Sequence, residues 1–146
     1  MAITSAICNS FKVEILTGTH DFTASTGNTF NLALYTSSAT LDKDTTAYSS
    51  TNEITNTSGT SYSAKGNALT SVTPVLSTDT AVCDFANTSW TSASFTSRGC
   101  LIFNDDAAGD PAVCAIDFGG DKTVTSGTFT IEFPAASAAT AIIGIA

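Results

Sequence analysis

Charged residues are scarce in this chain. They make up 12% of its 146 residues, about half the usual share of a globular protein, and only five of them are Lys or Arg. The cations are scattered, and the formal net charge is -8. Because nucleic acids and anionic membranes are bound through clustered Lys and Arg, we expect no nucleic acid and no membrane as a partner.

Long hydrophobic runs are also missing from the sequence. The longest candidate, residues 135–146, is shorter than a membrane span and is interrupted by Ser137 and Thr140. Its end, residues 141–145, is typical of a terminal strand in the core. The apolar residues before Lys12, the first cation, are interleaved with polar ones, unlike a secretory signal. We therefore expect the protein to be made and folded in the cytoplasm.

Cysteine is sparse as well, with four residues at Cys8, Cys83, Cys100 and Cys114. In a protein that folds in the cytoplasm these are expected to be reduced core residues, and their spacing has no metal-site pattern. Cys100 and Cys114 flank a turn-rich loop. A disulfide between them across a hairpin, formed after release into an oxidising environment, stays an alternative.

The chain is rich in hydroxyl residues and in short alternating runs. It contains 26 Thr and 18 Ser, and Thr suits the outward face of a strand. The clearest run covers residues 128–133, where Phe129, Ile131 and Phe133 alternate with polar residues. A period of two indicates a strand with one buried face and one wet face.

Similar runs follow one another from residue 81 onward. Residues 81–85 alternate, a further run covers 90–95, and residues 99–103 are continuously apolar after the glycine, as in a central strand covered on both faces. Residues 98–118 are typical of a β-hairpin. The glycines of residues 119–121 then predict a link to the next strand.

The N-terminal part has a different pattern, with apolar residues every four positions at Ile3, Ile7, Phe11 and Ile15. This spacing predicts a helix over about residues 3–16, capped by Thr4 or Ser5 and ended by Gly18. The helix either closes one end of the domain or acts as an arm that docks on a neighbouring subunit.

The next segment predicts a strand over residues 28–36, followed by a long surface loop over about 37–67. In the strand, Phe30, Leu32 and Leu34 are expected to point inward and Asn31, Ala33 and Tyr35 outward. Because structureless loops of this length are uncommon, a short strand is expected near Ala47 or residues 52–55. Taken together, residues 1–146 predict one all-β domain. It is a single antiparallel β-sandwich or jelly-roll-like domain of about eight strands with a short N-terminal helix.

Catalytic equipment is hard to find in the sequence. The single histidine, His20, is adjacent to Asp21 and is expected to be a turn residue with a local hydrogen bond, since no nucleophile turn accompanies it. The acids Glu14, Glu53 and Glu132 are far apart, unlike a glycosidase pair. We expect no enzyme activity, no catalytic residue and no cofactor.

Two further patterns have ordinary explanations. Asp105, Asp106 and Asp110 would suit calcium by their oxygen ligands, but their spacing is not that of a calcium loop and a hairpin turn explains the same residues. No metal site is therefore assigned. The glycosylation sequons at residues 56–58 and 87–89 are expected to be accidents of a Ser/Thr-rich chain.

Several segments nevertheless resemble a known family. They are AITSA at residues 2–6, FKVEIL at 11–16, NTFNLALYTS at 28–37, TNEI at 51–54, YSAKG at 62–66, RGCLIFN at 98–104 and DFG at 117–119. Together they are similar to small virion structural proteins of tailed bacteriophages. The sequence departs from that pattern at Lys65, where a second glycine is usual, and in having four cysteines.

The resemblance implies a capsid decoration (cement) protein that binds the outer surface of the phage head and stabilises it. The implied partners are the major capsid protein and two further copies of the chain, as a homotrimer on the virion. The main alternative is a tail, fibre or baseplate component involved in host attachment, which should carry exposed aromatics in loops; only Tyr48 and Tyr62 qualify. A carboxylate hydrolase and a carbohydrate-binding module are the remaining alternatives.

Overall fold

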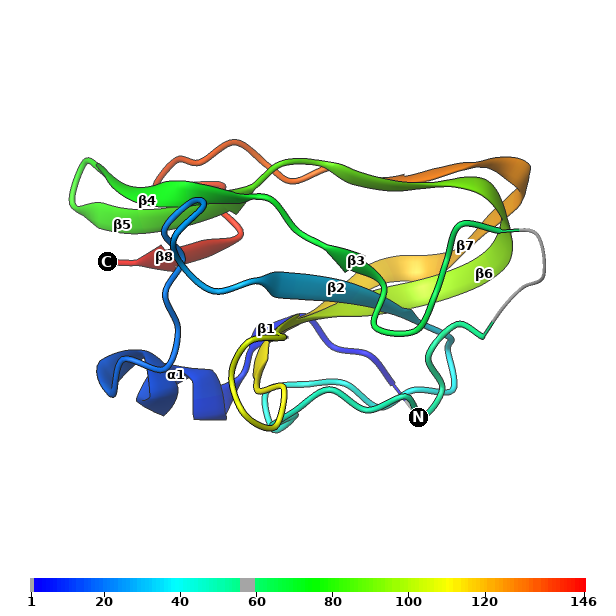
Figure 1. Cartoon of the computed structure of the whole chain (residues 1–146), viewed down its shortest axis with the longest axis horizontal. Helices are drawn as coiled ribbons and strands as arrows, with labels where there is room; N and C mark the ends of the chain where they lie inside the picture. The colour runs from blue at the N-terminus through cyan, green and yellow to red at the C-terminus, as the bar shows by residue number, and fades with distance from the viewer. Residues whose placement is uncertain (1, 56–59) are drawn as a thin grey trace.

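The computed structural model describes residues 2–55 and 60–146 and is an antiparallel β-sandwich with one short helix (Figure 1). One sheet has the strand order β1-β7-β6-β2-β3 and the other the order β4-β5-β8. The elements are β1 (Ala6–Ile7), α1 (Asn9–Leu16), β2 (Phe30–Tyr35), β3 (Asn67–Ala68), β4 (Ser71–Ser77), β5 (Thr80–Phe85), β6 (Thr88–Asn104), β7 (Ala112–Ile131) and β8 (Ile143–Ile145). The predicted all-β sandwich with a short N-terminal helix is confirmed.

The hairpin of β6 and β7 dominates the molecule. Its two strands pair from Thr88–Ile131 to Phe103–Ala112, and they curve around one end of the sandwich (Figure 1). The separate strands expected at 90–95 and 99–103 are thus one strand, and residues 119–121 are no link. The ladder continues because bulges absorb the irregular positions: Ser92, Gly119 and Ser126 have positive φ, next to shifts in register.

The middle of the larger sheet is buried on both faces. Residues 100–103 of β6 are fully buried, as predicted. The prediction that Asn31, Ala33 and Tyr35 of β2 face outward is wrong, because all six residues of β2 are buried. Their second face is covered by the segment that follows β2, where the Tyr35 hydroxyl donates to the Ser49 carbonyl and the Asn31 amide to the Lys65 carbonyl.

That covering segment is the predicted loop over about 37–67, of which residues 56–59 lie outside the described part. Instead of the expected short strand it makes isolated bridges, at Ala47 to Pro111 and at Glu53 to Tyr35. Both lie where a hidden strand was expected. The loop is therefore ordered and forms a lid over β2.

The N-terminal helix is shorter than the predicted 3–16. Ile3 bridges Leu41, and Ala6 and Ile7 form β1 against β7, so only Phe11 and Ile15 of the four periodic residues are helical. Pairing with β7 gives these residues the backbone partners that a first helical turn would leave unpaired. The N-cap is Cys8, without a side-chain bond, and not Thr4 or Ser5.

Gly18 ends the helix, as predicted. It has φ of 77°, and the N–H groups of Gly18 and Thr19 donate to the carbonyls of Ile15 and Glu14. This pair of bonds is the Schellman arrangement, which needs a left-handed residue at this position. Among the described residues, no helix is long and apolar enough to span a bilayer.

Candidate functional site

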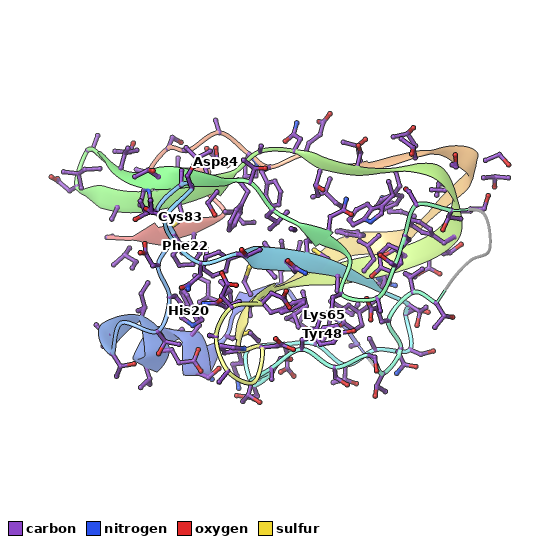
Figure 2. All side chains as sticks on the ribbon, in the orientation of Figure 1. His20, Phe22, Tyr48, Lys65, Cys83 and Asp84 are labelled. Atoms are coloured by element: carbon purple, nitrogen blue, oxygen red, sulfur yellow. The ribbon has the colours of Figure 1, made fainter. Side chains whose placement is uncertain are left out.

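His20 lies in the core and not in an exposed turn. Its side chain has no exposed surface, and it packs between the rings of Phe11, Phe22 and Phe30 (Figure 2). Its Nε2 is 2.8 Å from Oε2 of Glu14, and its Nδ1 is 3.1 Å from Nδ2 of Asn104. The prediction of a turn residue with a local hydrogen bond is wrong, because the partners of His20 lie in α1 and β6.

Asn104 determines which nitrogen of His20 carries the proton. The Oδ1 of Asn104 accepts the backbone N–H groups of Asp106 and Ala107, at 3.1 and 3.2 Å, which turns its amide nitrogen toward His20. Nδ1 of His20 must therefore accept, and Nε2 must donate to Glu14. Because both ring nitrogens have partners, this arrangement positions α1 against β6 and leaves neither nitrogen facing a substrate.

Glu53 is the second buried polar centre, and its side chain holds the lid segment. Its carboxylate accepts the hydroxyl of Tyr48 at 2.5 Å, the hydroxyl of Tyr62 at 2.7 Å and the backbone N–H of Lys65 at 2.8 Å. Tyr62 in turn accepts the N–H of Leu34 in β2. A carboxylate only accepts hydrogen bonds, so it matches three donors that converge on one buried point.

Removal of this carboxylate is expected to be costly. Glu53→Ala leaves the buried hydroxyl of Tyr62 and the partly buried hydroxyl of Tyr48 and N–H of Lys65 without their acceptor, and we expect a loss of about 3–4 kcal/mol in the free energy of unfolding. Glu132→Ala, at an exposed acid of the same type, should change it by less than about 0.5 kcal/mol. Urea denaturation of both variants measures the difference; equal midpoints would show that Glu53 does not hold the lid.

Two aspartates of the β6–β7 loop, Asp105 and Asp110, form ion pairs with Lys65. Its Nζ is 2.7 Å from Asp105 and 2.9 Å from Asp110, and 5.7 Å from the ring centre of Tyr48, which stacks on Phe103 (Figure 2). The hydrogen bonds to Asp105 and Asp110 raise the pKa of the Lys65 ammonium.

The remaining candidate acids have separate partners. Asp106 accepts the backbone N–H of Thr29, Glu14 is bound to His20, and Glu132 is exposed. In the described ranges, no three His, Cys, Asp or Glu side chains form a group able to hold a metal ion. Of the two sequons, Asn87 accepts the N–H of Phe133, and residues 56–58 lie outside the described part.

All four cysteines are free and buried, as expected for reduced core residues. The alternative disulfide is not formed: Cys100 is opposite Ile116 and Cys114 is opposite Ile102, so the two thiols are diagonal neighbours across the hairpin. Burial raises the pKa of Cys8 and Cys83 to about 11 and that of Cys114 to about 12. Their thiolate forms are therefore suppressed at neutral pH.

The most unusual surface is at the end of the molecule opposite the β6–β7 bend. It carries the large apolar side chains that are exposed among the described residues: Val13, Leu16, Val72, Val75, Leu76 and Ile145. Three of them belong to β4, and the others to α1 and β8, which lie at the same end (Figure 1). We call this surface the apolar end.

The apolar end contains a groove of about 310 Å³ between α1 and β8. Phe11, Ile15 and Leu16 line it on the helix side and Ile143 and Ile145 on the strand side. Leu16 is 87% exposed and Ile145 52% exposed, although both would be expected inside from their residue type.

The smaller sheet has open strand edges, and the edge of β8 adjoins the groove. In the smaller sheet β5 is central, so β4 and β8 each have one edge without a described neighbouring strand. Pro74 lies in β4, at a shift in register, as is usual for an edge strand. Exposed apolar side chains beside unpaired strand edges are typical of surfaces that bind another protein chain.

This surface has almost no signature in the sequence. The only signal was the adjacent pair Val75 and Leu76, which cannot both face the core in a strand buried on one side. Leu16 gave no signal, because exposure depends on what covers the helix.

No protein-family model, no curated protein and no solved structure matches this chain.

Proposed function

We propose that this chain is a structural protein of a tailed-bacteriophage particle, a decoration protein that binds the outer surface of the head and stabilises it. The observation that carries the proposal is the apolar end: exposed aliphatic side chains and two open strand edges on an otherwise hydroxyl-rich body. Such a surface is suited to permanent contacts between proteins. The sequence resemblance supplies the kind of assembly.

The composition of the remaining surface supports the same function. Thr and Ser hydroxyls lose less free energy on desolvation than charged groups do, so they can enter broad protein contacts at low cost. The partner would be the major capsid protein, with the chain on the outside of the virion after synthesis in the host cytoplasm. The resemblance adds the expectation of a homotrimer.

A tail, fibre or baseplate role in host attachment is the second candidate. Its one supporting feature in the sequence was the pair of loop tyrosines. Tyr62 is buried and Tyr48 is partly buried against Phe103, and both donate to Glu53, so neither is available to a receptor. This candidate therefore has less support than the head protein.

Particles that carry this chain provide the test. Gold-labelled antibody against the chain is expected to mark the head, and particles lacking the chain should release DNA at a lower temperature while adsorbing to cells normally. Label confined to the tail, with lost adsorption, would establish the alternative. Unlabelled particles of unchanged heat resistance would refute both.

A further inference from the structure

We infer that the apolar end is a contact between copies of this chain, in which the β4–β5 hairpin of one copy occupies the α1–β8 groove of the next. The inference deepens the proposed function by naming the surface through which copies meet. Only the number of copies in the assembly rests on the proposed function. Its physical basis is that the two halves of the contact are both present on this one chain and have matching chemistry.

The first match is in shape and apolar character. The groove is lined by aliphatic and aromatic side chains of α1 and β8, and it is open to solvent at Leu16 and Ile145. The hairpin presents Leu76, 71% exposed, on one face of β4 and Val75, 55% exposed, on the other face. Each surface alone is an aggregation hazard, and each removes the exposed apolar area of the other when they meet.

The second match is in charge. Among the described residues, Lys43, Lys65 and Arg98 are paired with carboxylates, whereas Lys12 and Lys122 form no ion pair. Lys12 lies on the rim of the groove and donates to the side-chain amide oxygen of Asn9. Asp79, in the turn of the β4–β5 hairpin, has no ion pair in the described part. A hairpin inserted beside β8 can place Asp79 against Lys12 of the neighbouring copy.

The third match is in backbone hydrogen bonding. Neither β8 on the side away from β5 nor β4 on its outer side has a neighbouring strand in the described part of the chain. Placing β4 of one copy along β8 of the next joins two three-stranded sheets into a continuous one. α1, β8 and the β4–β5 hairpin lie at one end of the molecule (Figure 1). Because the hairpin and the groove are different surfaces, the contact is head-to-tail, and copies form a ring where the rotation between neighbours closes, as a homotrimer requires.

A contact of this kind needs a modest share of the surface of the chain. A specific interface of standard size buries about 800 Å² on each partner, which is about a tenth of the 7035 Å² surface of the chain. Each copy makes two contacts, one through its hairpin and one through its groove, so the buried area is divided between them. Charged groups are few at both surfaces, so little of the apolar gain is offset by desolvation of ions.

Cross-linking tests the contact directly. The native thiols are buried, so single introduced cysteines at Lys12→Cys and Asp79→Cys are the reactive ones. A mixture of the two variants is expected to form a disulfide-linked dimer about tenfold faster than either variant alone, because only unlike sites meet. Thr125→Cys, in the outer half of β7 at the opposite end, is the matched control. A mixture that reacts no faster than this control overturns the inference.

Charge reversal gives an independent readout on the intact chain. Lys12→Glu alone and Asp79→Lys alone should each weaken association by roughly tenfold in sedimentation analysis, since each places like charges together. The double variant, with both changes in one chain, should return to within about twofold of the parent. Failure of the double variant to recover overturns the pairing, because a fold defect would add and not cancel.

Apolar substitutions complete the test. Leu16→Gln and Leu76→Gln replace side chains that are 87% and 71% exposed in one copy, so the circular dichroism spectrum should be unchanged while association is lost. A parent chain that stays monomeric at about 0.5 mM, where even millimolar contacts are populated, also overturns the inference. Association in solution without binding to phage heads would keep the inference and reject the proposed function.

Discussion

Gly66→Ala is expected to lower the free energy of unfolding by about 3–5 kcal/mol, a large part of the stability of a domain of this size. Gly66 has φ of 66°, in the left-handed region. A Cβ there would overlap the carbonyl oxygen of Leu32 and lie 2.7 Å from its carbonyl carbon and 2.9 Å from Cα of Ala33. These are backbone atoms of the buried strand β2, so they cannot move aside as a flexible side chain would.

Gly109→Ala is the matched control for this substitution. Gly109 also has positive φ, at 85°, but a Cβ there would meet nothing within 4 Å. The Gly109→Ala variant should therefore lose only the cost of a left-handed backbone, about 1 kcal/mol in the free energy of unfolding. Urea denaturation of the two variants separates the steric cost from the conformational one. Equal losses would mean that the lid does not lie against β2 as described.

Alkaline unfolding is the second large effect expected. The four buried thiols hold their protons more tightly in the folded chain than in the unfolded one: burial raises the pKa of Cys8, Cys83 and Cys114 from 9.0 to about 11, 11 and 12, and that of Cys100 well above 9.0. Stability is therefore independent of these groups below pH 9. It falls above pH 9, where only the unfolded chain loses protons.

The size of this effect follows from the number of thiols. Between its unfolded and folded pKa values, each thiol lowers the free energy of unfolding by about 1.4 kcal/mol per pH unit. The four together therefore lower it by about 5–6 kcal/mol per pH unit. A domain with a typical stability of about 5–15 kcal/mol should then unfold by roughly pH 11. Burial and the hydrogen bond to Glu53 also raise the pKa of Tyr48, to about 12, in the same direction.

Chemical denaturation between pH 7 and pH 11 measures the slope of stability against pH. Cys83→Ala, which removes one thiol at the margin of the core, should reduce that slope by about a quarter whatever it does to stability at pH 7. An unchanged slope in this variant, or a parent chain of constant stability up to pH 11, would contradict the assignment of the slope to buried thiols.

Lys65, which stands where the resembling family has a glycine, shows which part of a local conformation can be predicted from neighbouring residues. Lys65 has φ of 72°, directly before Gly66, so the position where glycine was expected does adopt the left-handed conformation. A non-glycine residue is held there because its N–H donates to Glu53 and its ammonium binds Asp105 and Asp110. The strain is local, but the groups that offset it come from distant parts of the chain.

His20 illustrates the opposite limit. Its neighbour Asp21 suggested a turn, because adjacent polar residues are the only partners that a sequence displays. In the folded chain its partners are Glu14, six residues away, and Asn104, 84 residues away. No periodicity predicts such a pair.

Alternation and turn chemistry act between neighbouring residues, so local patterns predict the strand at residues 81–85, the hairpin over residues 98–118 and the helix end at Gly18. They do not predict that β6 and β7 continue unbroken through their bulges. Long-range packing is needed to cover both faces of β2, to extend residues 3–7 along their neighbours before the helix begins, and to leave Leu16, Leu76 and Ile145 exposed. Whether an apolar side chain is exposed depends on which other segments of the chain cover it, and this is decided only when the two sheets pack together.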